Sequence, residues 1–468
     1  MTSKHTSGRT WPITRCPEPS PCWTNCPATT PERCCAVNLR LRRKPNDKWT
    51  LARAALELAN AANGVRPLAR NGYLSIPVFA FGWPTTELAP FYLTASAADA
   101  LRRGIRGDFA SRRGRLALLL HAVSWGLLAL LTRRNVASEP YFDAGLKEAL
   151  GENYREIAAT SQPAQQARKH AGVVGTGLSR RRYVEKTESI SYGPYGGANL
   201  ADIWRRGDLP RDGKAPVLLQ VPGGAWTIGM RRPQAYPMLS HLAERGWVCV
   251  SIAYRVSPRN TWPDHIVDVK RALAWIKENI ADYGGDPDFV AITGGSAGGH
   301  LTALTALTPN DPDFQPGFED ADTSVVAAVP VYGRYDWFST EGRGRREFMQ
   351  LLSWVVTKVG LTKGRQLYLD ASPIKRLRAD APPFFVLHGT DDSLIPVPEA
   401  REFVDALREV SNSAVAYSEI PHAQHAFDIF GSPRGHYTAE AIERFLSYVQ
   451  ARRHVTAEAI APSPSRQP

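Results

Sequence analysis

A serine lies between two pairs of glycines in the segment GGSAGG, residues 294–299. The preceding apolar run FVAIT predicts a buried strand, and the sequence from His300 onward predicts a helix. The segment matches G-x-S-x-G, the nucleophile elbow, in which glycines relieve crowding at a strained strand-to-helix corner. This placement predicts that Ser296 is a nucleophile. It also places the amide of Ala297 at a helix N-terminus, where it can stabilise a developing oxyanion.

A pair of carboxylates follows another apolar run, in the segment VLHGTDDSLIP. Asp391 and Asp392 both lie just past the predicted strand, where an acid can orient a histidine and stabilise its charged form. Position alone leaves both as candidates. The simpler interpretation, in which an aspartate only caps the next helix, fits Asp391 better than it fits the pair.

Two histidines, His422 and His425, follow the last apolar run. A loop histidine by itself is more often a surface residue than a base. Here a histidine would complete the chain order Ser, Asp, His that the α/β-hydrolase topology imposes. We select His425, which precedes Ala426 and Phe427, as the base that accepts the proton of Ser296.

A glycine loop, VPGGAWTIG (221–229), follows the run PVLLQV. Bare backbone amides at this edge of a sheet can face the serine, so Gly224 and Ala225, in a loop with Gly223, are predicted to complete an oxyanion hole with Ala297. The predicted chemistry is attack on an ester carbonyl, formation of an acyl-enzyme and its hydrolysis by water. This chemistry requires no metal or organic cofactor.

The elements that must position these residues alternate between strands and helices. Near-continuous apolar runs have the character of buried parallel strands, and residues 263–280 carry the apolar stripe of a helix on a sheet, as do residues 437–451. The pattern predicts an α/β fold with a mostly parallel central sheet and helices on both faces. Residues 183–189 and 199–205 predict an antiparallel hairpin at its edge. The predicted strands are 216–221, 247–253, 289–293, 325–332, 383–388 and 414–420.

Composition divides the 468 residues into five parts. Five of the six cysteines lie in the first 35 residues, with a spacing that matches neither a zinc module nor a small disulfide domain, and Cys249 is expected in the core. The expected parts are a disordered Cys- and Pro-rich tail (1–50), a helical apolar extension (51–161), a linker (162–178), the catalytic domain (179–453) and a second disordered tail (454–468).

The net charge of +12 is concentrated in arginine runs that flank an apolar stretch, LALLLHAVSWGLLALL (116–131). This stretch is shorter than the about 20 residues of an upright membrane span. Three interpretations are open: a soluble helical subdomain, membrane-surface or re-entrant helices, and true spans. We favour peripheral or monotopic attachment to an anionic membrane surface, with a cytoplasmic location as the alternative. No nucleic-acid motif accompanies the charge.

Over about residues 180–450 the chain resembles the esterases and lipases of the α/β-hydrolase fold, in the hormone-sensitive-lipase-like branch. It looks most like the actinobacterial and mycobacterial esterase/lipases, on the motifs VPGGAW, YGGDPDFVAITGGSAGGHLTAL, HGTDDSLIP and HAQHAF. The resemblance implies a carboxylesterase or lipase, with a role in lipid metabolism. In the family pattern H-G-x-x-D the last aspartate is catalytic and corresponds to Asp392, and the histidine of H-A-F corresponds to His425.

One departure from the family concerns the oxyanion loop. The family usually has His-Gly-Gly-Gly, whereas this chain begins the motif with Pro222. Proline cannot supply side-chain hydrogen bonds that would brace the loop. Reduced activity or an altered acyl preference is the expected consequence to test.

An insertion between strands, residues 334–361, contains a predicted apolar helix (348–359) that could cap the site, with core packing as the equal alternative. Two other functions remain open: an arylformamidase or amidase on the same fold, and a catalytically inactive scaffold at a membrane. The candidate pocket residues are Trp226, Phe348, Leu352, Trp354 and Val355.

Overall fold

The computed structural model describes residues 47–70, 72–161, 172–184, 190–342 and 345–460. Most of the two predicted tails and the five N-terminal cysteines lie outside these residues. Residues 47–50 begin a helix and residues 454–460 end one, so these edges of the predicted disordered tails are helical. Cys249 is buried in a strand, as expected.

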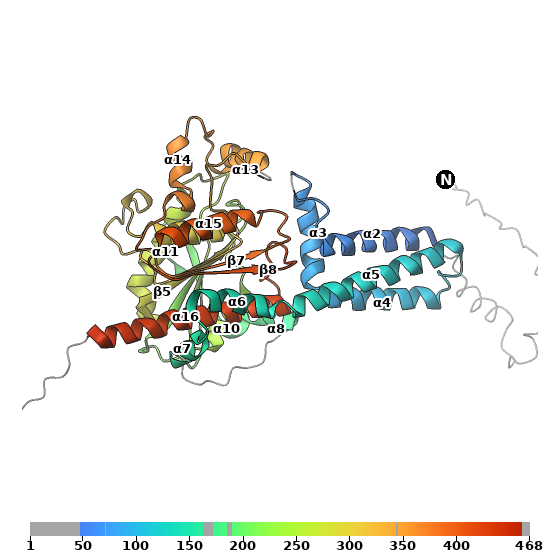
Figure 1. The fold of residues 1–468 in the computed structure, drawn as a ribbon, viewed down its shortest axis with the longest axis horizontal. Coiled ribbons are helices and arrows are strands. Elements are labelled where there is room, and N and C mark those ends of the chain that lie inside the picture. Colours follow the sequence, from blue (N-terminus) through green and yellow to red (C-terminus); the bar gives the residue numbers. More distant parts are fainter. Residues whose placement is uncertain (1–46, 71, 162–171, 185–189, 343–344, 461–468) are drawn as a thin grey trace, which may run out of the picture.

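A single eight-stranded sheet organises most of the described chain (Figure 1). Its strand order is β1-β2-β4-β3-β5-β6-β7-β8, and every pair from β4 onward in this order is parallel. β1 and β2 form the antiparallel edge. This arrangement confirms the predicted α/β-hydrolase class. The strands are β1 (Ile190–Ser191), β2 (Leu200–Trp204), β3 (Ala215–Val221), β4 (Val248–Ile252), β5 (Gly285–Gly295), β6 (Ala328–Val331), β7 (Phe384–Gly389) and β8 (Val415–Ile420).

The antiparallel edge differs from the predicted hairpin. β2 pairs with the two residues of β1, and Val184 adds one isolated bridge to Trp204. Tyr183 ends a short helix, α9 (Arg180–Tyr183), and residues 185–189 lie outside the described chain. The predicted strand 183–189 was therefore wrong at its first residue, because the hydrogen bond from the Val184 amide to the Arg180 carbonyl closes a helical turn there.

Helices cover both faces of the sheet (Figure 1). α11 (Asp264–Asn279), α12 (Ala297–Leu307) and α15 (Pro398–Val410) share one core with the strands. α6 (Glu139–Leu150), α10 (Tyr236–Glu244) and α16 (Pro433–Ile460) share the other. Neighbouring residues of β3 enter opposite cores, Leu219 the first and Leu218 the second. This burial on both faces explains why the strands read as continuous apolar runs.

Shorter helices connect these layers. α8 (Gly172–Leu178) occupies the second half of the predicted linker. In the insertion, α13 (Arg345–Leu351) continues as one π-helical turn (Leu352–Val356) in place of the predicted helix 348–359. Thr357 ends it, because its amide donates to the Leu352 carbonyl five residues back and its side chain bonds there as well. Two further short helices are α7 (Tyr154–Thr160) and α14 (Arg365–Asp370).

The N-terminal helices form an elongated bundle that projects from the hydrolase body (Figure 1). α2 (Asp47–Val65) and α4 (Ala89–Ile105) pack on α5 (Arg112–Val136), and α3 (Ser75–Glu87) lies at the junction with the body. We call α2, α4 and α5 the N-terminal bundle. Within the described residues, the stretch Arg112–Leu150 is long and apolar enough to cross a membrane by length and composition.

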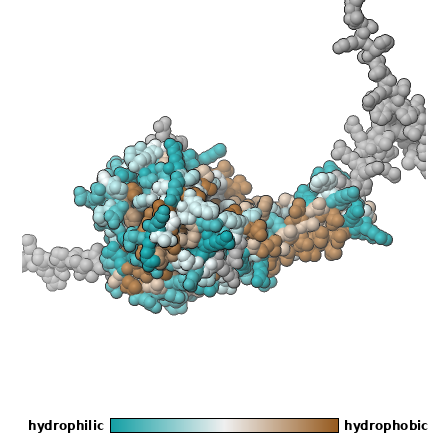
Figure 2. All heavy atoms as spheres, turned by 90° about the horizontal axis from the view of Figure 1, so that it is seen from above, coloured by the Kyte–Doolittle hydropathy of each residue, from teal (hydrophilic) through white to brown (hydrophobic). Residues whose placement is uncertain are grey.

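The N-terminal bundle buries polar side chains among apolar ones and leaves several leucines exposed. In α5 the buried residues include His121, Ser124 and Asn135 together with Leu128 and Leu131, whereas other leucines of the helix face outward. Inside the bundle, the Ser96 hydroxyl donates to Glu57 (2.5 Å) and accepts from the Trp125 indole (2.7 Å). Figure 2 shows the resulting band of apolar atoms along the projecting bundle, with hydrophilic residues at its far end. The exposed leucines of α5 are Leu116, Leu118, Leu119 and Leu130.

Candidate active site

The predicted elbow joins β5 to α12. Ser296 has φ 59° and ψ −120°, a strained conformation for a non-glycine residue. A Cβ at Gly294 would lie 2.6 Å from the carbonyl oxygens of Gly298 and Val221, so this position needs glycine. The Ser296 amide donates to the Val331 carbonyl (2.9 Å). The elbow therefore fixes the serine at the carboxyl end of the parallel strands.

The loop after β7 brings Asp392 against His425. His425 Nδ1 lies 2.6 Å from Asp392 Oδ2, and both side chains are buried. The other carboxylate oxygen accepts the amides of Leu394 and Ile395, each at 2.8 Å. Burial alone would raise the pKa of Asp392, but the charges and hydrogen bonds of His425 and His388 outweigh it and hold that pKa well below its ordinary value. Asp392 is thus an ionised partner for the imidazole.

The two alternative candidates pair with each other. His422 Nδ1 lies 3.4 Å from Asp391 Oδ2 in an exposed position. The other Asp391 oxygen accepts a hydrogen bond from Arg70 at 2.6 Å. Only the His425 and Asp392 pair combines a short hydrogen bond with burial of both partners.

Tyr332 links the elbow to the histidine. A Cβ at Gly295 would lie 2.7 Å from the Tyr332 ring, and that ring lies 4.6 Å from the His425 ring, centroid to centroid. Ser296 and His425 therefore share a neighbour at the same end of the sheet. Among the described residues, Ser296 Oγ and His425 form no direct hydrogen bond.

The glycine loop after β3 lies against the elbow. A Cβ at Gly223 would lie 2.6 Å from the Gly295 carbonyl and 3.2 Å from Ser296 Cβ. The next three residues, Gly224, Ala225 and Trp226, all have positive φ, at 133°, 51° and 58°. This backbone turns sharply beside the serine, as a loop that presents amides to an oxyanion must do.

A glutamine side chain forms hydrogen bonds to the loop that Pro222 cannot form. The side-chain oxygen of Gln234 accepts the Gly223 amide (2.8 Å), and its side-chain nitrogen donates to the Gly223 carbonyl (3.0 Å). The Tyr254 hydroxyl donates to the Pro222 carbonyl (3.1 Å). The loop is therefore held from both sides without a histidine. Sequence reasoning missed Gln234, because it lies 11 residues after Gly223 in an irregular segment with no motif.

The candidate pocket residues lie in different environments. Trp226 is buried, and its indole donates to His300 (3.2 Å). Phe348 is buried under the Arg334 guanidinium. Leu352 has no exposed surface and packs in the core. Trp354 is 69% exposed and Val355 is half-buried, so the helix turns them outward.

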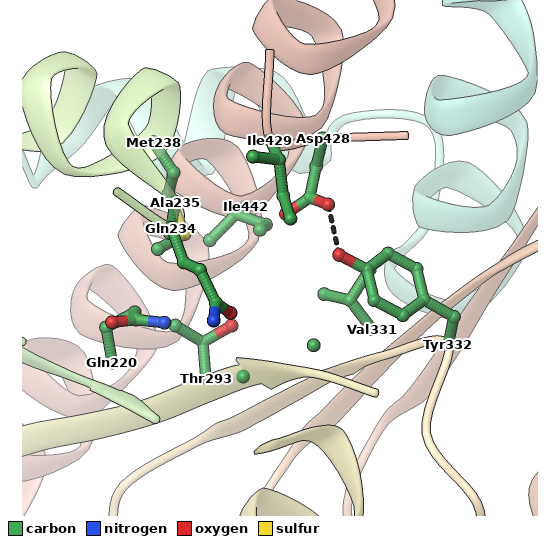
Figure 3. Close-up of a pocket in the computed structure, with 12 residues that line it drawn as sticks. Gln220, Gln234, Ala235, Met238, Thr293, Val331, Tyr332, Asp428, Ile429 and Ile442 are labelled. Carbon is green, nitrogen blue, oxygen red and sulfur yellow. Dashed lines mark hydrogen bonds between the residues drawn. The ribbon is translucent and has the colours of Figure 1, made fainter. Parts of the chain in front are cut away.

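A small cavity lies behind the elbow (Figure 3). Its lining comes from separate segments, and its polar side chains include Gln234 and Thr293. The Tyr332 hydroxyl donates to Asp428 across it, and burial raises the pKa of Asp428. No single motif predicts a cavity assembled in this way. Among the described residues, no group of three or more His, Cys, Asp or Glu side chains could hold a metal ion.

The chain is similar to known ester hydrolases. Residues 208–407 match the BD-FAE family model. The chain is 50% identical to the probable carboxylic ester hydrolase LipM of Mycobacterium tuberculosis (strain ATCC 25618 / H37Rv), over 86% of this chain and 94% of that protein. Esterase LipQ of the same organism is 50% identical over 66% of this chain and 74% of its own length. Esterase LipC of that organism is 49% identical over 59% and 68%, respectively. Among solved structures, a truncated carbohydrate esterase from gut microbiota is similar at 20% identity and a TM-score of 0.49, over 57% of this chain and 97% of that one.

Proposed function

Because the chain belongs to the family of carboxylic ester hydrolases that includes LipM, LipQ and LipC, it is a carboxylic ester hydrolase, and we propose that Ser296, His425 and Asp392 are its catalytic triad. The observation that carries the triad is the buried 2.6 Å contact between His425 and Asp392, at the same end of the sheet as a strained serine elbow. The substrate is an acyl ester.

In the proposed mechanism, His425 accepts the proton of Ser296 as the serine oxygen attacks the ester carbonyl. The amides of Gly224, Ala225 and Ala297 donate to the oxyanion of the tetrahedral intermediate. The alcohol leaves with the proton from His425, and the acyl group stays on Ser296. A water molecule, deprotonated by His425, then attacks the acyl-enzyme and releases the acid.

Asp392 supports this reaction through the negative charge of its carboxylate. Its pKa lies well below the ordinary value, so it remains a carboxylate throughout the pH range in which an ester hydrolase works. A carboxylate beside Nδ1 fixes the imidazole tautomer and stabilises the imidazolium that forms during attack. Its second oxygen is occupied by two backbone amides, which prevents rotation of the carboxylate.

The test of the reaction class compares rates on short p-nitrophenyl esters and on aryl formamides, for the wild type and Ser296→Ala. We expect ester hydrolysis to dominate and to fall by at least about 10³-fold in the variant. A strong preference for formamides would favour the amidase alternative. A wild-type rate no higher than that of the uncatalysed reaction on either substrate would favour the inactive scaffold.

We further propose that the N-terminal bundle attaches the enzyme to an anionic membrane surface. Support comes from the exposed leucines of α5 and from the polar side chains that the bundle buries, because polar side chains of membrane-embedded helices face the bundle interior and apolar side chains face lipid. The exposed arginines at the far end suit anionic headgroups. These are Arg102, Arg106, Arg112, Arg113 and Arg115.

A further inference from the structure

One helix of the N-terminal region, α3, contacts the loop that carries the catalytic histidine. The Trp83 indole N–H donates to the Ala426 carbonyl at 2.7 Å, across 343 residues of sequence. The Trp83 ring also stacks on Phe430, with centroids 4.7 Å apart. Both partners lie in the segment that follows β8 and contains His425. α3 thus contacts two residues that follow His425 in this loop, Ala426 and Phe430.

The backbone that Trp83 holds is strained. Ala426, the residue after His425, has φ 62°, a left-handed conformation that alanine adopts only when its surroundings impose it. A hydrogen bond to the Ala426 carbonyl fixes the orientation of the peptide unit that begins there. Because His425 precedes Ala426 directly, its ring position depends on this local backbone.

The imidazole itself receives an edge contact from α3. The Phe79 ring lies 5.6 Å from the His425 ring at 78°, and Phe79 stacks on Trp83 at 5.4 Å. Tyr332 supplies the contact from the hydrolase body at 4.6 Å. His425 is therefore positioned by two aromatic rings, one from the body and one from the N-terminal region.

The C-terminal end of α3 is anchored to the same segment by a buried ion pair. Glu87 accepts the Arg434 guanidinium at 2.6 Å and the Ser432 hydroxyl at 2.8 Å. Asn135, at the end of α5, donates to Glu87 at 3.0 Å. These buried contacts leave α3 little freedom to move relative to the start of α16.

We infer that α3 is part of the active-site scaffold and that Trp83 is a positioning residue for His425, with Phe79 as its support. This inference rests on the proposed function, because it assigns Trp83 a role in the reaction of Ser296. It also goes beyond membrane attachment, because the N-terminal region then contributes to catalysis as well as to the location of the enzyme. Trp83 touches no reacting atom and acts through Ala426 and His425.

The test uses the full-length chain with Trp83→Phe, which removes the N–H donor and keeps an aromatic ring. Trp49→Phe, at an exposed position of α2, is the matched control. For Trp83→Phe we expect kcat and the rate of fluorophosphonate labelling to fall about 10-fold, with KM within about 2-fold of the wild type. Trp49→Phe is expected to match the wild type in all three.

A folded Trp83→Phe protein with unchanged kcat and labelling rate overturns the inference, even if its melting temperature falls. If Trp83→Phe does not fold, Phe79→Leu decides: a lower kcat at constant KM supports the inference, and an unchanged kcat overturns it. A wild-type protein that neither hydrolyses esters nor reacts at Ser296 would overturn the proposed function and the inference with it. An active wild type with an unaffected variant overturns the inference alone.

Discussion

Several residues with strained backbone conformations lie close to the proposed catalytic groups. Positive φ angles occur at Ser296 and at Ala426, next to the histidine, and also in the glycine loop at Ala225 and Trp226. Each such residue costs about 1–3 kcal/mol and persists only where its surroundings impose it. At Ala426 those surroundings include the Trp83 indole, which donates a hydrogen bond to the Ala426 carbonyl.

Gln234 is the residue on which the oxyanion loop most depends. Gln234→Met keeps the side-chain length and removes both hydrogen bonds to Gly223. We expect kcat/KM for p-nitrophenyl butyrate to fall about 10- to 100-fold, because small displacements of catalytic groups cost that much. Gln366→Met, at an exposed position of α14, is the matched control. Equal activity in both variants would show that the loop does not need this brace.

The triad candidates could be predicted from sequence because each follows a strand, and parallel strands end at one edge of the sheet. Gln234 and Trp83 could not be predicted in this way. Gln234 has no motif, and the Trp83 contact joins positions 343 residues apart. Position alone also left Asp391 and Asp392 equivalent, whereas the structure separates them by burial and by histidine partner.

At the scale of the element, α5 is informative because it exposes several leucines while it buries polar side chains. The sequence showed an apolar stretch between arginines, but periodicity could not tell which side faced the bundle. Burial answers this: His121, Ser124 and Asn135 point inward together with Leu128 and Leu131, whereas Leu116 and Leu119 are exposed. Soluble proteins rarely leave a leucine face of this length uncovered.

The membrane proposal predicts the effect of charge on that leucine face. Leu116→Asp combined with Leu119→Asp is expected to abolish co-flotation of the full-length protein with vesicles that contain phosphatidylglycerol. An aspartate is unfavourable in the apolar part of a bilayer, whereas exposed leucines in water tolerate the change within about 0.5 kcal/mol. Val410→Asp, on an exposed position of α15, is the control. Unchanged flotation of the double variant would favour a soluble helical subdomain.

At the scale of the whole molecule, buried neutral histidines make folding sensitive to acid. Burial lowers the pKa of His265 to about 4 and that of His300 to about 3, from ordinary values of 6.5. His300 is satisfied as the neutral form, because Nδ1 accepts the Trp226 indole and Nε2 faces the Ala371 carbonyl at 2.7 Å. Its second proton would have no acceptor.

The sign of the pH dependence follows from these lowered pKa values. Below pH 6.5 the unfolded chain binds protons that the folded chain refuses, so the free energy of unfolding falls as the pH drops from 6.5 towards 4. Each histidine contributes at most about 1.4 kcal/mol per pH unit. Urea unfolding at several pH values should therefore show a smaller slope for His300→Asn than for the wild type. Identical slopes would contradict the assignment of His300 as a buried neutral group.

Identification of the nucleophile by covalent labelling is the most direct test of the proposed reaction. The full-length protein is treated with a fluorophosphonate, digested, and the adduct mapped by mass spectrometry, in parallel with Ser296→Ala and His425→Ala. We expect one phosphonylated peptide, with the adduct on Ser296, no adduct in Ser296→Ala, and labelling slowed by at least about 10³-fold in His425→Ala. A stoichiometric adduct on another residue, or labelling that persists in folded Ser296→Ala, would contradict it.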